Sequence, residues 1–292
     1  MPEKVFEEYL KKINDSLEKY IPEDGTDLTN AMRYSLLVGG KRIRPVLTLA
    51  FCELMGGNAE KALPFACAVE MVHTYSLIFD DLPAMDNDDM RRGKPSNHKV
   101  FGEAMAMLGG LGLLSKAFEL TTASPVLAGV DTETALKASN LLSRAAGLDG
   151  ILPGQAFDIE NDGTKTLSYE EVLKIHKLKT SAMLEAAVLL GCLAAGTGDK
   201  TQAKAREYAV NVGLAFQIRD DILDVIGNSE KMGKTLGKDK TEQKTTFVDV
   251  FGVEKSQEYV IEYTEKAKKI LSEFENNGFL MYLTDMLCTR EN

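Results

Sequence analysis

The chain has 292 residues, which is ample for a substantial core, and 44% of them are hydrophobic, an ordinary fraction for a folded globular protein. Its net charge of −10 argues against a nucleic-acid partner. No Pro-, Gly- or Ser-rich linker and no shift in composition divides the chain, so we expect a single domain over residues 1–292.

Apolar residues recur at three- and four-residue spacing along most of the chain, whereas alternating strand-like runs are nearly absent. Residues 5–17 mark a first amphipathic helix, and residues 28–37 mark a second that ends at Gly39-Gly40. A third apolar helix begins near Pro45. The pattern predicts an all-α protein.

The segment between the second and third helices is basic. Lys41, Arg42 and Arg44 follow two glycines that allow the backbone to approach a ligand closely. Cations at the start of a helix oppose its dipole and therefore favour a nearby anion. At this point an ordinary loop with solvated charges remains an equal alternative.

The first of two acidic clusters closes the next helix, predicted over residues 59–81. His73 and Ser76 fall on the same helical stripe as Asp80. Pro83 breaks the helix and lets Asp86 turn back toward Asp80. Several carboxylates at the end of an apolar helix are costly unless a cation neutralises them, and oxygen-only ligands suit Mg²⁺.

Basic and polar signals follow the first cluster. Arg91 and Arg92 offer planar forks suited to phosphate oxygens. A glycine-rich helix predicted over residues 100–120 suggests close helix contact. Gln155 and Asp158 can share a helix face, residues 161–168 are predicted to form a loop, and the next apolar helix is entered at Lys179-Thr180. Such a Lys usually reaches to water, but in a cavity lined by Asp it would bind a phosphate.

The second acidic cluster lies at residues 220–224. Asp220 and Asp224 are four apart and share a helix face, where like charges repel and a divalent ion would relieve the repulsion, while Asp221 is offset. A Gly/Lys loop around Lys234 comes next. Residues 253–292 are predicted to form two amphipathic helices.

Cysteine usage and the chain ends bear on location. The cysteines are scattered in apolar surroundings without metal-ligand spacing and are expected to be free thiols: Cys52, Cys67, Cys192 and Cys288. The charged N-terminus lacks the apolar stretch of a signal peptide, and the longest apolar tract, about residues 186–196, is too short to span a bilayer. We expect a cytoplasmic protein without membrane insertion.

Taken together, these motifs resemble the trans-prenyltransferase (polyprenyl diphosphate synthase) family over nearly the whole chain. The motifs are both acidic clusters, Gly-Gly-Lys-Arg-x-Arg-Pro at residues 39–45, and the Gly-Gln, Lys-Thr and Phe-Gln pairs at residues 154–155, 179–180 and 216–217. The four-residue gap within the first cluster, with Tyr75 five residues before Asp80, is similar to bacterial farnesyl diphosphate synthases (geranyltranstransferases).

The resemblance implies an isoprenoid-synthase-type bundle of about ten or more helices around a central cavity. It implies an enzyme that condenses isopentenyl diphosphate head to tail with dimethylallyl or geranyl diphosphate to give farnesyl diphosphate. The implied cofactor is Mg²⁺, as three ions when substrate is bound, and the implied assembly is a homodimer.

The resemblance also assigns roles to residues. The implied metal ligands are Asp80, Asp86, Asp220 and Asp224, with Asp81 and Asp221 in support. The allylic diphosphate would be bound by Arg91, Lys179 and Lys234, and isopentenyl diphosphate by Lys41, Arg44, His73 and Arg92. Thr180 and Gln217 would line the carbocation with oxygen dipoles. The implied catalytic set is Asp80, Asp81, Asp86, Lys179, Thr180, Gln217 and Asp220.

Product length has its own candidate residues, Tyr75 and Ser76. Five residues at a rise of about 1.5 Å place Tyr75 roughly 7.5 Å down the helix from Asp80, where a ring can act as a floor for the growing chain. On an ideal helix Ser76 aligns with Asp80 and Tyr75 is turned away from it, so the resemblance is what favours Tyr75.

Two departures from the family leave alternatives open. Phe79 stands where the family commonly has His, and Leu111 stands where it commonly has Asp. Both favour a non-catalytic subunit of a prenyl synthase, although the intact second cluster argues against it. A terpene cyclase is disfavoured by Lys41, Arg44 and His73, and a geranylgeranyl diphosphate synthase is the nearest alternative.

Overall fold

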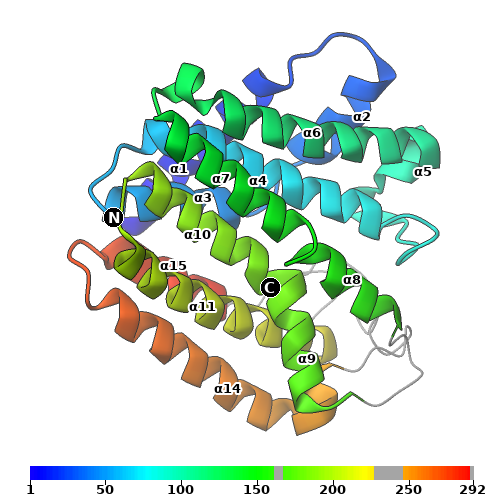
Figure 1. Ribbon diagram of the computed structural model, residues 1–292. Helices are drawn as coiled ribbons and strands as arrows, with labels where there is room; N and C mark the ends of the chain where they lie inside the picture. The colour runs from blue at the N-terminus through cyan, green and yellow to red at the C-terminus, as the bar shows by residue number, and fades with distance from the viewer. Residues whose placement is uncertain (161–166, 227–245, 290–292) are drawn as a thin grey trace. The chain divides into compact units, whose positions relative to one another are not determined.

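The computed structural model describes residues 1–160, 167–226 and 246–289, and in these ranges the chain is helical apart from its connections and one short hairpin (Figure 1). The prediction of an all-α protein is confirmed. The contacts divide the chain into two compact units, Met1–Ser143 with Ala186–Thr197, and Arg144–Glu185 with Gly198–Asn292. The single domain over residues 1–292 stays a prediction, and each unit is described by itself.

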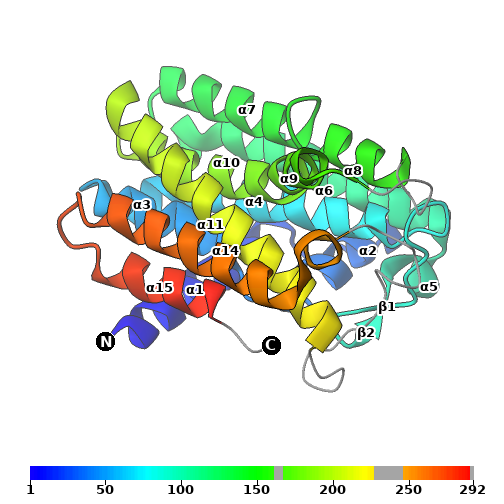
Figure 2. The same cartoon turned by 90° about the horizontal axis from the view of Figure 1, so that it is seen from below.

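The first unit is built around two long helices, α4 and α6, which lie side by side (Figure 1). A short antiparallel hairpin precedes α5 (Figure 2). The elements that contribute to this unit are α1 (Pro2–Tyr20), α2 (Asp27–Leu37), α3 (Ile43–Leu54), α4 (Ala59–Asp80), β1 (Met90–Arg91), β2 (Lys94–Pro95), α5 (Asn97–Phe101), α6 (Glu103–Ala128), and most of α7 (Thr132–Ala146) and α10 (Ala182–Ala194).

The central helix α4 begins where the Asn58 side chain accepts a hydrogen bond from the Glu60 amide at 2.9 Å, a cap that the exposed end of a helix requires. With 22 residues, the helix is long and apolar enough to cross a membrane by length and composition alone. However, 72% of its most apolar 18-residue stretch is buried inside the structure. Burial of this kind is expected for a core helix. Helix α4 is thus a longer apolar segment than residues 186–196, which the sequence had singled out.

Glycines bring α6 close to its neighbours. A Cβ at Gly109 would lie 3.2 Å from the Cβ of Ala31 in α2, and a Cβ at Gly110 would lie 2.7 Å from a ring carbon of Phe79 in α4. The close contact predicted for this glycine-rich segment is therefore present. The single helix predicted over residues 100–120 is instead two, because Gly102 has φ 80° and ψ 159° and ends α5 before α6 begins.

The second unit places the long helix α11 beside α14 (Figures 1 and 2). Capping boxes start two of its helices, Ser168 with Glu171 before α9 and Thr246 with Asp249 before α14. Its described elements are α8 (Ile151–Glu160), α9 (Tyr169–His176), the π-helical turn η1 (Lys177–Ser181), α11 (Asp199–Ile226), α14 (Phe247–Leu271) and α15 (Gly278–Cys288). The loop predicted at residues 161–168 and the Gly/Lys loop around Lys234 lie largely or wholly outside the described residues.

Candidate active site

The loop after α4 folds the first acidic cluster back on itself. The Asp86 amide donates to the Asp80 carbonyl at 2.9 Å, and the Asp88 amide donates to the Asp81 carbonyl at 3.1 Å. The reversal follows Pro83, as expected from a residue that cannot continue the helix. Asp80 and Asp86, six residues apart in the chain, are therefore neighbours.

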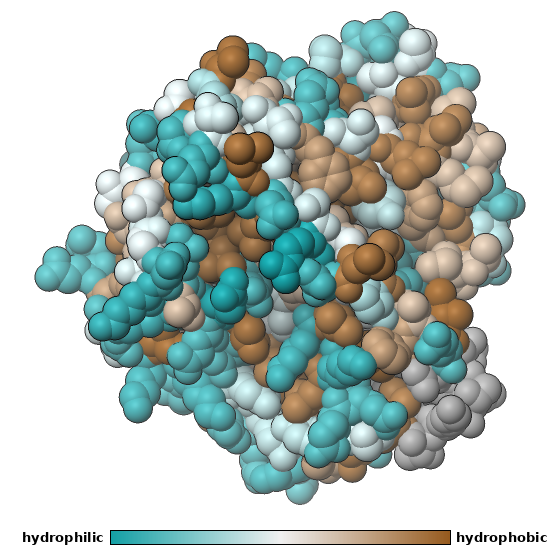
Figure 3. All heavy atoms as spheres, viewed as in Figure 1, coloured by the Kyte–Doolittle hydropathy of each residue, from teal (hydrophilic) through white to brown (hydrophobic). Residues whose placement is uncertain are grey.

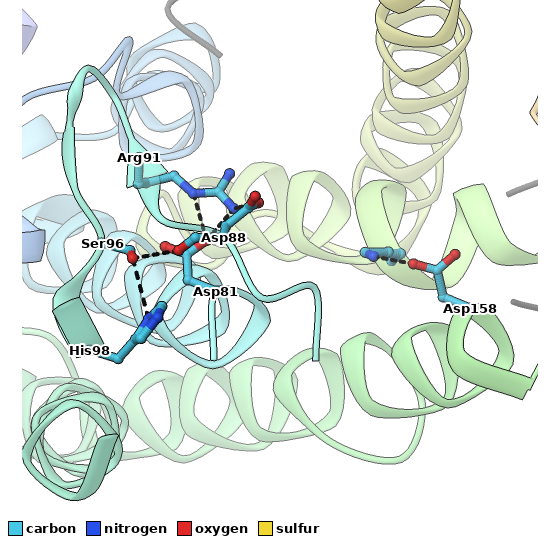
Figure 4. Close-up of polar contacts among 7 residues, drawn as sticks. Asp81, Asp88, Arg91, Ser96, His98 and Asp158 are labelled. Atoms are coloured by element: carbon cyan, nitrogen blue, oxygen red, sulfur yellow. Dashed lines mark hydrogen bonds and ion pairs between the residues drawn. The ribbon is translucent and has the colours of Figure 1, made fainter. Parts of the chain in front are cut away.

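Arg91 holds the buried member of this cluster. Its Nε donates to Asp81 Oδ1 at 2.9 Å and its Nη2 contacts both Asp81 Oδ1 and Asp88 Oδ2, the latter at 3.3 Å (Figure 4). Asp81 is only 2% exposed. Burial raises the pKa of Asp81, and the Arg91 guanidinium offsets part of that rise. Arg91, predicted to bind the allylic diphosphate, thus also fixes the loop that carries the carboxylates.

Arg92 lies on the glycine pair of the basic loop. Its Nη1 donates to the Gly39 carbonyl, and a Cβ on Gly40 would lie 2.8 Å from the centre of its guanidinium. Gly40 has φ 129°, a value that residues with a side chain rarely adopt. Burial lowers the pKa of Arg92. The glycine pair therefore allows Arg92 to lie against the backbone, while the predicted approach to a ligand stays a prediction.

A buried ion pair anchors the same loop. Arg42, in the left-handed region at φ 49°, donates from Nη1 to Glu70 Oε1 at 2.8 Å, and the two side chains are 1% and 2% exposed. Its Nε donates to Asn14 Oδ1 at 3.1 Å and its Nη2 to the Leu36 carbonyl at 2.6 Å. All three guanidinium nitrogens are thereby bonded, which a buried cation requires. Lys41 and Arg44 flank this fixed point.

His73 is partly buried and experiences the positive charge of nearby arginines. Burial first, and then the charges of Arg44 and Arg92, hold the pKa of His73 well below its ordinary value. Ser76, one turn further along α4, donates from Oγ to the His73 carbonyl at 2.9 Å. The charges of Arg44 and Arg92 thus act on His73, and the predicted binding of isopentenyl diphosphate by these three residues and by the exposed Lys41 stays a prediction.

Two aromatic rings pack together just before Asp80. The ring centroids of Tyr75 and Phe79 are 4.8 Å apart, and Phe79 fills the space beside Gly110. The departure at Phe79 is thus accommodated by packing, whereas the departure at Leu111 lies on the surface, where its residue is 49% exposed.

In the second unit, the π-helical turn η1 carries Lys179 and Thr180. A π-turn within a helix often marks a functional site. Lys179 Nζ contacts Asp158 Oδ2 at 2.5 Å (Figure 4). Glycine at 154 lets α8 approach η1 closely, because a Cβ there would lie 2.8 Å from the Lys179 amide nitrogen. Lys179 is therefore directed to the face of α8 on which Asp158 lies.

Thr180 is joined to the second acidic cluster. Its hydroxyl donates to Gln217 Oε1 at 2.6 Å, and Gln217 Nε2 donates to Asp221 Oδ1 at 3.1 Å. Asp221 and Asp224 are buried, 5% and 6% exposed. In each cluster the second Asp of the pair, Asp81 or Asp221, is thus buried and bonded to protein donors.

Across residues 1–160, 167–226 and 246–289, no three His, Cys, Asp or Glu side chains are grouped closely enough to hold a metal ion by themselves. Mg²⁺ is ordinarily held by one or two carboxylates together with waters and substrate phosphates, so Asp80 with Asp86, and Asp220, suit this ion. The predicted metal roles of Asp80, Asp86, Asp220 and Asp224 stay predictions.

Several contacts in the site were not predicted from the sequence. Glu70 has no role in the prediction from the sequence, and its only signal is a charge within the otherwise apolar residues 62–72. His176, whose Nε2 lies 3.4 Å from Asp221 Oδ2, has no role in the prediction from the sequence. Asp158 was singled out only for its spacing from Gln155. Lys234, predicted to bind the allylic diphosphate, lies outside the described residues.

Known proteins are similar to this chain over nearly its whole length. Geranylgeranyl pyrophosphate synthase from Capsicum annuum is 46% identical over 96% of this chain and 76% of its own. Farnesyl diphosphate synthase from Geobacillus stearothermophilus is 43% identical over 99% of this chain and 98% of its own. The crystal structure of an FPP/GFPP synthase from Zymomonas mobilis superposes with a TM-score of 0.88 at 31% identity, covering 99% of this chain and 100% of that one.

The sequence model of the Polyprenyl synthetase family matches residues 26–277. This match spans the basic loop and both acidic clusters that the structure describes. The chain belongs to the polyprenyl synthetase family, and it is a prenyltransferase that condenses isopentenyl diphosphate with allylic diphosphates.

Proposed function

We propose that this chain is a farnesyl diphosphate synthase, which adds isopentenyl diphosphate to dimethylallyl diphosphate and then to geranyl diphosphate. The observation that carries this choice is the packed pair Tyr75 and Phe79, whose ring centroids are 4.8 Å apart in the turn and a half before Asp80. A chain anchored at Asp80 by its diphosphate grows along this helix, and two locked rings are a rigid barrier to it.

The acidic side chains would hold Mg²⁺, which neutralises the leaving diphosphate when bound. Asp80, Asp86, Asp220 and Asp224 are its proposed ligands, as three ions with substrate. Arg91, Lys179 and Lys234 are proposed to bind the same diphosphate. Positive charges placed where negative charge develops lower the barrier to ionisation of the allylic C–O bond.

The second substrate is proposed to lie at the basic loop. Lys41, Arg44 and Arg92 supply its cationic partners, and His73, with its lowered pKa, is a neutral hydrogen-bonding partner. Thr180 and Gln217 are proposed to present oxygen dipoles to the allylic cation. The departing diphosphate is the proposed acceptor of the proton lost on condensation, since it leaves as an anion beside the cation that forms.

A product assay tests the proposal. The protein is incubated with dimethylallyl and isopentenyl diphosphates and Mg²⁺, and the dephosphorylated products are sized by chromatography. Farnesol is the expected main product. Geranylgeraniol as the main product would select the alternative favoured by the identity to geranylgeranyl synthases, and the absence of any prenyl product would select the non-catalytic subunit.

Tyr75→Ala should shift the main product toward geranylgeranyl or longer chains while the first condensation is largely retained. Removal of the ring opens a cavity beside Phe79 and leaves the carboxylates of the site in place. Chromatography of the dephosphorylated products is the measurement. Tyr75→Phe keeps the ring and is the matched control, so an equal product distribution in all three proteins would remove Tyr75 as the floor.

Gly40→Ala should raise the KM for isopentenyl diphosphate by about tenfold, because the new methyl group displaces the Arg92 guanidinium and a charged hydrogen bond contributes about 1.5–3 kcal/mol. Gly39→Ala is the matched control. Gly39 also has a positive φ, 102°, but a Cβ there meets nothing within 4 Å. An equal rise of this KM in the two variants would show that backbone strain, and not displacement of Arg92, raises it. An unchanged KM in Gly40→Ala would contradict the proposed role of Arg92.

The proposed assembly is a homodimer. Exposed apolar side chains gather in the upper right of the face in Figure 3, the part that α6 occupies in Figure 1. On α6 itself Met107, Leu108 and Leu111 are 40%, 53% and 49% exposed. A surface of this kind is typical of a partner interface.

Cytoplasmic location is likewise proposed from the bacterial farnesyl relative, although the Capsicum annuum relative is chloroplastic.

A further inference from the structure

Asp221 accepts hydrogen bonds from donors on two elements of the second unit and lies beside a histidine on a third. Its Oδ1 accepts from Gln217 Nε2 at 3.1 Å, within α11. Its Oδ2 accepts from the Phe247 amide at 3.0 Å, at the start of α14, and His176 Nε2 at the end of α9 lies 3.4 Å from the same oxygen. The residue is 5% exposed. Both carboxylate oxygens are therefore engaged by the protein.

This arrangement decides which way the Gln217 amide faces. An ionised carboxylate only accepts hydrogen bonds, so it selects the NH₂ group of Gln217 and turns Oε1 the other way. Oε1 accepts from the Thr180 hydroxyl at 2.6 Å. With the amide reversed, NH₂ would face Thr180 and the carbonyl oxygen would face a carboxylate, which is unfavourable in a buried site.

The orientation of the Gln217 amide in turn fixes the direction of the Thr180 hydroxyl proton. Its residue is 8% exposed, and its single hydroxyl proton is donated to Gln217. A hydroxyl has one proton and two lone pairs, so once the proton is committed only the lone pairs remain for another partner. Lone pairs stabilise a positive centre and the O–H end repels it.

We propose that Asp221 is a positioning residue: through Gln217 it fixes the Thr180 hydroxyl with its lone pairs toward the allylic cation, and it does not ligate the metal. The inference rests on the proposed prenyl transfer. The His176 ring, which lies near the Asp221 oxygen that accepts from the Phe247 amide, stacks on the Phe247 ring with centroids 6.2 Å apart. Asp221 is separated in role from its neighbour Asp220.

A charge swap tests the link. In Asp221→Asn the side chain has one acceptor oxygen for two donors, so Gln217 turns or moves. In Gln217→Glu two carboxylates face each other. In the double variant, the amide introduced at position 221 donates from its NH₂ to the carboxylate introduced at position 217 and accepts from the Phe247 amide. The second oxygen of that carboxylate accepts from Thr180, so the hydrogen-bond pattern and the net charge are both restored.

The first readout is thermal unfolding of the metal-free protein. Each single variant is expected to lower Tm by about 5 °C, and the double variant is expected to melt above both. Additive losses would overturn the inference. The second readout is steady-state kinetics, in which Asp221→Asn is expected to lower kcat by about 10- to 100-fold with little change in the allylic KM, and the double variant is expected to recover part of kcat.

The Mg²⁺ concentration for half-maximal activity separates positioning from ligation. In Asp221→Asn this concentration should stay within about twofold of its value in the parent protein. In Asp220→Asn, the same isosteric change at the neighbouring residue, it should rise. An equal rise in both would overturn the inference. If Asp221→Asn does not accumulate as folded protein, the double variant compared with Gln217→Glu alone tests the same link, and no gain in kcat over Gln217→Glu would contradict it. Absence of prenyl product from the parent chain would instead reject the proposed function.

Discussion

Chelation of divalent metal should abolish turnover, and Asp220→Ala should lower kcat by at least about 100-fold. Two anionic substrates meet a chain of net charge −10 that carries two acidic clusters, so catalysis without a cation would require like charges to approach each other. The measurement is initial rate after exhaustive dialysis against chelator, followed by titration with Mg²⁺.

The matched control for Asp220 is Asp89→Ala. Asp89 also belongs to an acidic cluster, but its side chain is 67% exposed and pairs with Lys99 at 3.0 Å. An exposed pair contributes little, so turnover should stay near that of the parent. Full turnover in the chelated protein, or equal losses in the two variants, would contradict the proposed role of the metal.

Glu70→Ala should lower the free energy of unfolding by about 3–5 kcal/mol, because it leaves the guanidinium of Arg42 buried without a countercharge. The pair is 2.8 Å long and both side chains are almost fully buried. Loss of the pair also loosens the basic loop, so the KM for isopentenyl diphosphate should rise with it. Urea unfolding followed by circular dichroism measures the first effect.

Asp15→Ala is the control for the stability of the buried pair. Asp15 pairs with Lys11 at 2.6 Å one turn away on α1, with both side chains more than half exposed. Exposed pairs at this spacing contribute about 0.3–0.5 kcal/mol. Similar losses for Glu70→Ala and Asp15→Ala would show that burial does not amplify the Arg42 interaction.

The fold class and the order of the helices were readable from the sequence because apolar spacing is a local property. The turn of Asp86 toward Asp80 was predicted for the same reason, since Pro83 determines it within a few residues. The resemblance selected the acidic and basic residues of the site in advance.

What the sequence did not predict depends on packing between distant segments. Glu70 is hidden within α4, and only the packing of the basic loop against that helix makes it the partner of Arg42. The hydrogen bond from the Phe247 amide to Asp221 requires α14 to begin beside α11. No local sequence pattern predicts that packing. The break at Gly102 was missed because its positive φ, and not a lack of apolar spacing, ends α5.

Phe79 and Gly110 constrain each other's evolution. A side chain gained at position 110 would meet the ring at once, since even a Cβ would lie 2.7 Å from it, whereas loss of the ring first would leave room for the newcomer. The two positions are therefore epistatic, and only one order of replacement avoids an overpacked intermediate. While Phe79 is present, glycine at position 110 avoids this overlap, and the ring of Tyr75 keeps Phe79 as its neighbour.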